Sequence, residues 1–222
     1  MPAAVLQIGG RIRAERAKKG ISLRSLARGV GLSPSLISQI ETGKCQPSVS
    51  TLYAITNVLG ISVQDVLGET AAAAEVRHAA GAGRVADGNL ALAAAPAAAA
   101  RAGAAADLAG PVVCPGQRDV LELDLGVVWQ RLGQVPGSNV DFLLVTYQPG
   151  GCSSPGGRLM RHAGTEYGYL IQGELTLTLG RQSHRLTPGD AVSFPSVTPH
   201  AYRNEGTVPS AGVWFVADSG GG

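Results

Sequence analysis

The 222-residue sequence has little cysteine, few aromatic residues and no long hydrophobic run. Its three cysteines are far apart and form no CxxC pair, which argues against a disulfide framework and fits a reducing cytosol. No stretch reaches the roughly 18 apolar residues that a membrane helix needs. Arginines interrupt the first residues before an apolar run forms, so we expect no secretory signal, no membrane partner and a cytoplasmic location.

The sequence also lacks a strong net charge, but its charges are unevenly spread. The formal net charge is +2. Residues 1–70 carry eight Lys/Arg against four Asp/Glu, whereas residues 111–222 carry seven against nine. A basic N-terminal segment on a slightly acidic remainder indicates an anionic partner for the first part only.

Composition divides the chain into three parts, and the expected fold class is multidomain α plus β. Residues 1–70 are predicted to form a domain of five short helices. Residues 71–110, of which 21 are alanine, lack the large apolar side chains of a core and are predicted to be a linker. Residues 111–222 change to a two-residue rhythm of short strands, which predicts a small antiparallel β-barrel or sandwich.

The helical part carries start and stop signals in the right order. Ser33 can cap a helix in which Pro34 takes the favoured first position. Gly31 ends the helix before it, and Gly43 ends the helix that Pro34 begins. Two helices joined by a tight glycine turn form the helix-turn-helix arrangement of DNA-binding proteins.

The segment SLRSLARGVGLSPSLISQIETGKCQPSVSTLYAITNVLGIS closely resembles the XRE family, the lambda-repressor/Cro type of helix-turn-helix protein. The resemblance covers about residues 7–67 and implies a double-stranded DNA operator as partner. The residues in family register are Ala27, Gly31, Ser38, Gln39, Glu41, Gly43, Pro47 and Leu52.

Helical spacing predicts that Leu36, Ile37 and Ile40 are buried, which leaves the opposite face of their helix for DNA. Gln39 is suited to bind adenine through N6 and N7, and basic side chains can neutralise phosphates. Glu41 is expected to be structural, pairing with a basic residue or capping a turn. The predicted DNA-binding residues are Arg11, Arg24, Ser33, Pro34, Ser35, Ser38, Gln39, Thr42 and Lys44. The alternative is a protein-binding module with solvated charges.

The segment RLMRHAGTEYGYLIQG, residues 158–173, resembles the first motif of the cupin family. Three residues separate His162 from Glu166, and six separate Glu166 from Gly173, as in that motif. Met160 stands where the motif has its first histidine. The segment GDAVSFPSVTPHAYRN, residues 189–204, resembles the second motif and supplies Gly189, Pro195, His200 and Asn204 in register. The resemblance spans about residues 118–217 and implies a cupin barrel.

The ligand types that remain in these motifs are His162, Glu166 and His200, a possible metal set. Two histidines and a carboxylate suit non-heme Fe(II) or a three-ligand zinc site, and the ion could be iron, zinc, nickel or manganese. Met160 is expected to face the same side as His162 and Glu166 and to line an apolar pocket. The predicted effector pocket consists of Met160, His162, Glu166, His200 and Tyr202. In the alternative, His162 and Glu166 hydrogen-bond each other or a ligand in a metal-free pocket.

Alternation along the strands also predicts where other barrel side chains lie. Most of six aromatic residues are expected in the core, with Tyr202 reaching the cavity, and His184 is expected at the surface. The six aromatic residues are Tyr167, Tyr169, Phe194, Tyr202, Trp214 and Phe215.

The order of the two domains resembles that of bacterial transcription regulators with a cupin sensor. We therefore expect a cytoplasmic regulator, with repression favoured, that binds a pseudo-palindromic operator as a homodimer or higher homo-oligomer. The barrel would supply the dimer interface and a pocket for a small-molecule effector. The architecture also resembles the iron-dependent hydroxypropylphosphonate epoxidase, so a non-heme Fe(II) enzyme is the alternative. A scaffold protein is a third. The intact helix-turn-helix pattern favours the regulator, and no catalytic residue is assigned.

Overall fold

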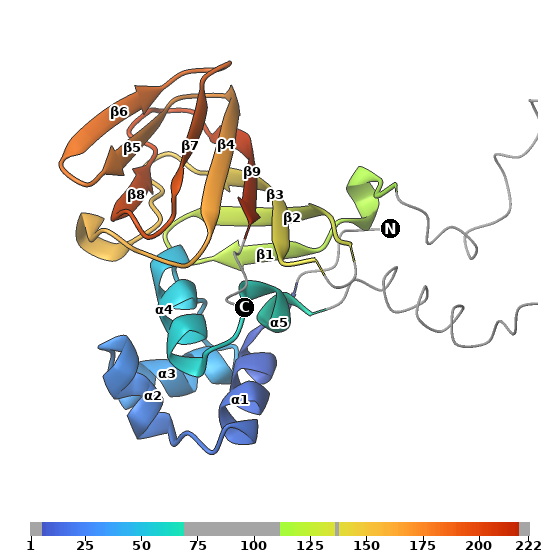
Figure 1. Ribbon diagram of the computed structural model, residues 1–222, viewed down its shortest axis with the longest axis vertical. Helices are drawn as coiled ribbons and strands as arrows, with labels where there is room; N and C mark the ends of the chain where they lie inside the picture. The colour runs from blue at the N-terminus through green and yellow to red at the C-terminus, as the bar shows by residue number, and fades with distance from the viewer. Residues whose placement is uncertain (1–5, 69–111, 136–137, 218–222) are drawn as a thin grey trace, which may run out of the picture.

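The computed structural model describes residues 6–68, 112–135 and 138–217, with helices first and strands after them. In Figure 1 the helices form one body and the strands another. The predicted linker, residues 71–110, lies outside the described residues. None of the helices in the described ranges is long and apolar enough to span a membrane. The helices are α1 (Gly9–Lys18), α2 (Leu23–Val30), α3 (Pro34–Glu41), α4 (Val49–Leu59) and α5 (Val63–Leu67).

The helix boundaries follow the local signals in the sequence. The Ser33 side chain accepts a hydrogen bond from the Leu36 backbone N–H, and Pro34 is the first residue of α3. Gly31 ends α2 with a left-handed φ of 74°, which glycine adopts without steric cost. The predicted caps are thereby confirmed. The first helix begins at Gly9. Apolar side chains from the helices form the core of this body, among them Ile12, Leu26, Ile37, Leu52 and Ile55.

The strands form two antiparallel sheets, which confirms the expected small β-barrel or sandwich. The larger sheet has the order β1-β2-β3-β9-β4-β7 and the smaller has the order β6-β5-β8. The strands are β1 (Val120–Leu123), β2 (Val127–Gly133), β3 (Val140–Tyr147), β4 (Thr165–Gln172), β5 (Leu175–Leu179), β6 (Gln182–Leu186), β7 (Ala191–Pro195), β8 (His200–Arg203) and β9 (Ser210–Ala217).

The burial of the barrel aromatics agrees only in part with the prediction. Phe194, Tyr202 and Trp214 are buried, whereas Tyr167 is 49% exposed and Phe215 is 38% exposed. Tyr169, at 50% exposed, is on the outside as well. The reason is strand parity: Glu166 and Trp214 face inward, so their immediate neighbours on β4 and β9 face outward. His184 is exposed, as expected.

The turn between β4 and β5 needs a glycine at position 173. Gly173 has a φ of +73°, and a Cβ atom there would lie 2.6 Å from the Pro209 carbonyl oxygen. We expect Gly173→Ala to lower the free energy of unfolding by about 3 kcal/mol, because left-handed strain and a backbone clash add together. Gly180→Ala is the control, since Gly180 also has a positive φ but open space around it. Chemical denaturation compares the two variants, and equal losses would contradict the clash.

The helical body docks on the barrel through α4 and the segments at its ends (Figure 1). The Ser50 N–H donates to the Ser153 carbonyl at 2.9 Å, and the Asp124 N–H donates to the Pro47 carbonyl at 3.0 Å. At the other end, the Arg131 guanidinium in β2 donates to the Gly68 carbonyl at 2.7 Å. One face of α4 therefore packs in the helical core while another lies against the barrel.

Candidate functional site

Three polar side chains converge inside the barrel, as the motif spacing predicts. Glu166 comes from β4, His200 begins β8, and His162 lies in the loop that leads into β4. Met160 and His200 exchange two backbone hydrogen bonds, of 2.8 and 3.0 Å, which hold the His162 loop against β8. The His162 Nε2 is 3.0 Å and the His200 Nε2 is 3.3 Å from the same Glu166 Oε1. All three residues are buried, with exposures of 5% or less.

The hydrogen bonds of the two Nδ1 atoms determine the tautomers of His162 and His200. The Nδ1 of His162 is 3.0 Å from the Ala163 carbonyl oxygen, and the Nδ1 of His200 is 2.8 Å from that of Thr198. A carbonyl only accepts, so each Nδ1 carries a hydrogen. In a neutral imidazole each Nε2 then presents a lone pair to the Glu166 carboxylate. The buried Nε2 of His200 lies 3.3 Å from Glu166 Oε1 without a well-directed hydrogen bond to it or to any other described residue, so a cation between these atoms fits the arrangement.

The electrostatics of the three groups agree with that geometry. Burial raises the pKa of Glu166, but hydrogen bonds and positive charge from His162 and His200 outweigh it and lower the pKa to about 2. Burial lowers the pKa of His200, but the hydrogen bond and charge of Glu166 outweigh burial and raise it above its usual value. The carboxylate therefore stays ionised and attracts positive charge, which a proton or a metal ion can supply.

Two further side chains orient the Glu166 carboxylate through its other oxygen, Oε2. The Tyr202 hydroxyl donates to Glu166 Oε2 at 2.9 Å, and the Trp214 indole N–H donates to the Tyr202 oxygen at 3.1 Å. Burial, and then the nearby Glu166 charge, raise the pKa of Tyr202 well above its usual value, so Tyr202 remains a neutral donor. Oε1 is left for the histidines. Outer hydrogen bonds of this kind orient metal ligands in proteins.

The donor set fits a divalent metal ion. The ligand atoms of His162, Glu166 and His200 all lie within 4.8 Å of one another. Both histidines present Nε2 with Nδ1 bound to a carbonyl, the usual state of a metal-bound imidazole. The remaining motif residues have other places. Met160 lines the apolar side of the cavity beside Glu166 and Tyr202, and Asn204 holds a loop by donating to the Tyr147 and Val208 carbonyls.

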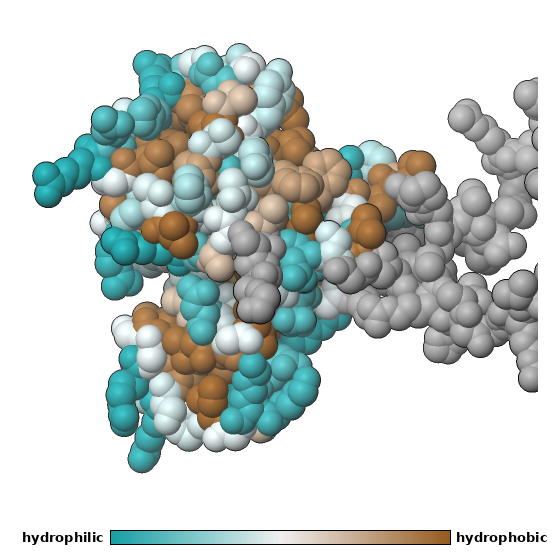
Figure 2. Space-filling model, viewed as in Figure 1, coloured by the Kyte–Doolittle hydropathy of each residue, from teal (hydrophilic) through white to brown (hydrophobic). Residues whose placement is uncertain are grey.

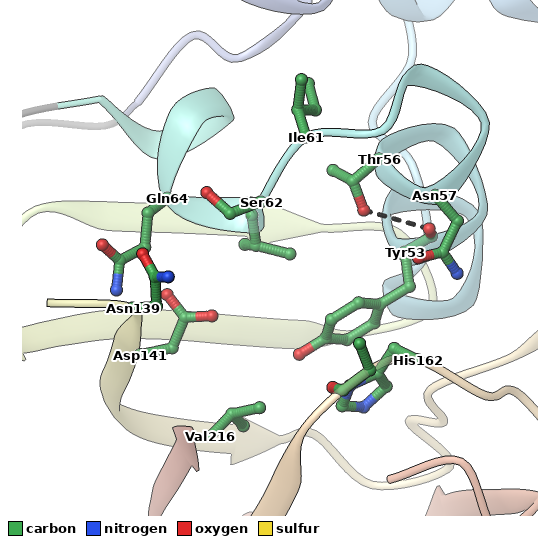
Figure 3. Close-up of a pocket in the computed structure, with 12 residues that line it drawn as sticks. Tyr53, Thr56, Asn57, Ile61, Ser62, Gln64, Asn139, Asp141, His162 and Val216 are labelled. Carbon is green, nitrogen blue, oxygen red and sulfur yellow. Dashed lines mark hydrogen bonds between the residues drawn. The ribbon is translucent and has the colours of Figure 1, made fainter. Parts of the chain in front are cut away.

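A tyrosine from the helical body lies against this site, which the sequence did not predict. The Tyr53 ring of α4 stacks on the His162 ring with centroids 3.8 Å apart and planes 5° apart. Figure 3 shows both rings at the wall of a cavity of about 40 Å³ that Asp141 and Asn139 also line. A second cavity, of about 20 Å³, lies between Tyr53 and Glu166. Together these spaces suit an ion and water rather than an organic effector.

A larger cleft lies outside the barrel, where α4 faces the loop before β4. It encloses about 240 Å³, and the exposed residues Arg158 and Arg161 line it with Ser50 and Thr51. Met160 lines this cleft as well as the inner cavity. The two arginines that flank the first motif thus face the helical body rather than His162, Glu166 and His200.

Most of the predicted DNA-binding residues are exposed on the helical body. Ser35, Gln39 and Thr42 on and after α3 are exposed, and Ser38 is half-buried. Figure 2 shows hydrophilic residues along the rim formed by α1 and α2. Arg11 differs from the other predicted residues, because its guanidinium is engaged within the domain. It donates to the carbonyls of Val66 and Leu67 at the end of α5. The other predicted residues are also exposed: Arg24, Ser33, Pro34 and Lys44.

Glu41 has the structural role that we expected. Its carboxylate is buried and forms two hydrogen bonds with the Arg16 guanidinium of α1. This pair joins the end of α3 to α1 and is not available to DNA.

Comparison with known proteins places both parts of the chain. Residues 12–66 match the helix-turn-helix family, and residues 143–216 match the cupin domain family. The helix-turn-helix transcriptional regulator YazB of Bacillus subtilis is 36% identical over 58 residues, which are 84% of its length and 26% of this chain. The chain belongs to the XRE-type helix-turn-helix family, and it carries a C-terminal cupin domain.

Two similarities extend over both domains of this XRE-type protein. The transcriptional regulator PuuR of Escherichia coli is 27% identical over 207 residues, which cover 92% of this chain and 89% of PuuR. The crystal structure of a helix-turn-helix transcriptional regulator from Vibrio cholerae has a TM-score of 0.58 at 19% identity, covering 95% of this chain and 94% of that one. The second similarity shows that the two-domain fold is shared.

Proposed function

We propose that this protein is a cytoplasmic transcriptional repressor that binds operator DNA as a homodimer and senses a small-molecule effector in its cupin domain. The observation that carries the proposal is the exposed polar face of α3, with Ser35, Gln39 and Thr42 directed away from the helical core. The similarity to PuuR over both domains supports a regulator with this architecture.

DNA binding is tested by replacing Gln39. With a duplex selected from a random library, we expect Gln39→Ala to weaken binding about 5- to 150-fold, because one bidentate base contact contributes about 1–3 kcal/mol. Binding of the wild type should fall steeply with salt, since phosphate contacts release counterions. Fluorescence anisotropy measures both effects. Gln182→Ala, at an exposed position of β6, is the control. Equal affinities for the two variants would mean that α3 does not contact the bases.

A row of exposed aromatic side chains supports the dimer. Phe142 on β3 pairs with Phe215 on β9, and Phe215 pairs with Tyr167 on β4. Their ring centroids are 6.3 and 6.2 Å apart, and all three are at least 38% exposed. An apolar surface across a sheet is suited to a second copy of the same chain, and a two-fold operator requires two copies.

The barrel site supports a sensor that holds a divalent ion through His162, Glu166 and His200. The bound ion would fix the buried carboxylate and both imidazoles, and the positions left open could bind an effector. An effector that binds one arrangement of the domains better than another changes DNA affinity by that difference.

The alternative function is a non-heme Fe(II) enzyme, with which the donor set is compatible. Two histidines and one carboxylate are the ligands of Fe(II) oxygenases. The ion itself distinguishes the two functions. Stoichiometric iron, with oxygen consumption that depends on it, would support the enzyme, whereas zinc, nickel or manganese would support the sensor.

A further inference from the structure

The barrel as described has no room for an organic effector, and the residue that fills the space belongs to the DNA-binding domain. Cavities that bind small molecules usually enclose about 300 Å³ or more. Beside Glu166 and His162 the free spaces are only about 20 and 40 Å³. Tyr53 borders both spaces and is itself only 6% exposed.

The Tyr53 ring occupies a slot with flat aromatic walls. It stacks on His162 at 3.8 Å and lies 6.2 Å from the Trp129 ring, at an angle of 59°. Asn139 and Asp141 supply polar groups at the rim, and Figure 3 shows the Tyr53 hydroxyl pointing to that side. The slot therefore matches a planar aromatic compound with a polar group at one end.

The walls of this slot differ in how firmly they are held. Trp129 and Glu166 lie on strands that pair with neighbours on both sides. The α4 wall, which carries Tyr53, is attached near its start by the Ser50–Ser153 hydrogen bond and farther along by Asn57, which donates to the Arg161 carbonyl at 3.4 Å. The α4 wall can therefore move away from Trp129 and Glu166 without breaking either sheet.

Movement of α4 would carry the DNA-binding helix with it. α4 packs against α2, which packs against α3, and Leu52, Ile55 and Leu59 of α4 are buried on the helical side of the protein. Interiors packed in this way move as rigid units. A ligand that takes the place of Tyr53 would thus displace the helix-turn-helix domain from the barrel, which also requires the Asp124–Pro47 and Arg131–Gly68 hydrogen bonds to break.

We infer that the effector of the barrel is a planar aromatic compound that competes with the Tyr53 side chain for the slot beside His162, so that effector binding and docking of the DNA-binding domain exclude each other. The inference rests on the proposed sensing function and adds to it the ligand class and the moving part.

The test uses the full chain and 4-methylphenol, which has the shape of the tyrosine side chain. We expect Tyr53→Ala to bind 4-methylphenol at least about ten-fold more tightly than the wild type, because an excised ring leaves a cavity that binds its equivalent. Saturation-transfer NMR and the thermal midpoint measure binding. Tyr169→Ala, which removes an exposed tyrosine of β4, is the control and should behave like the wild type. If Tyr53→Ala does not fold, the same binding measurements are made on Tyr53→Leu.

Acrylamide quenching of tryptophan fluorescence reports whether α4 remains docked, because Trp129, 4% exposed, is the tryptophan beside the Tyr53 ring, whereas Trp214 lies beside Tyr202. We expect 4-methylphenol to decrease quenching in Tyr53→Ala, where it refills the slot, and to increase quenching in the wild type at the higher concentrations where it displaces Tyr53. Equal affinity for wild type and Tyr53→Ala would overturn the inference. So would no uptake by either folded Tyr53 variant, or binding to the wild type with unchanged quenching. No DNA is present, so these outcomes are independent of whether α3 binds an operator.

Discussion

Replacing His162 with alanine is expected to remove the metal ion from the protein. In the wild type, purified without chelator or histidine tag, we expect close to one divalent ion per chain. The variant should bind it at least about 100-fold more weakly, because loss of a ligand costs more than the 10–100-fold loss typical of outer-shell partners. Elemental analysis of both proteins, followed by titration with the ion that is found, gives the answer.

The physical reason is that the two histidines face the same oxygen of the Glu166 carboxylate. Without His162, the buried Glu166 keeps only the His200 Nε2, at 3.3 Å, beside its Oε1. Two protein ligands rarely hold a divalent ion against water, whereas three define a catalytic-type zinc or iron site. His184→Ala is the matched control, because His184 is an exposed histidine of β6. An absence of metal in the wild type would disprove the metal site, as would equal metal content in all three proteins.

Replacing Arg16 with alanine is expected to destabilise the helix-turn-helix domain by about 3 kcal/mol, because the change leaves the Glu41 carboxylate buried without its cation. The Glu41 side chain is 3% exposed, and the Arg16 side chain is 14% exposed. Arg16 also donates to the Ile21 carbonyl at 2.9 Å, so it joins α1, the turn after it and the end of α3. The hydrogen bond and charge of Glu41 raise the pKa of Arg16 despite burial, so the guanidinium stays protonated.

Denaturant unfolding followed by circular dichroism measures this loss. Lys18→Ala on the same helix is the control, since Lys18 is 74% exposed and 3.6 Å from Glu15. A surface pair of that kind contributes about 0–1 kcal/mol. A loss for Arg16→Ala no larger than that for Lys18→Ala would show that water solvates Glu41 after the change.

The features that could be predicted from the sequence are those with local causes. The capping of α3 by Ser33 depends on a hydrogen bond three residues away, and the His162–Glu166 spacing depends on a short strand entry. Both follow from neighbouring residues. The convergence of His200 on the same carboxylate is not local, and it was predicted only through the resemblance to the cupin motifs.

The features that were missed depend on which surfaces meet. Helical spacing in α4 identifies Leu52 and Ile55 as core residues but gives no reason for Tyr53 to be buried, because the barrel covers it. Alternation of residue types in β4 divides its side chains between two faces of the strand, but it does not show which face points into the barrel. Glu166, once assigned to the inside, would have placed Tyr167 and Tyr169 outside. Consistent use of that parity would have corrected the prediction.

We propose above all that this chain binds a specific DNA sequence as a symmetric dimer. Selection of duplexes from a random library by the folded wild-type protein tests it most directly. We expect enrichment of an inverted repeat whose half-sites are about 10 base pairs apart, or a multiple of that spacing, because two copies of α3 must face the same side of the duplex. Enrichment of no sequence by protein that is folded and of stable mass would contradict the account.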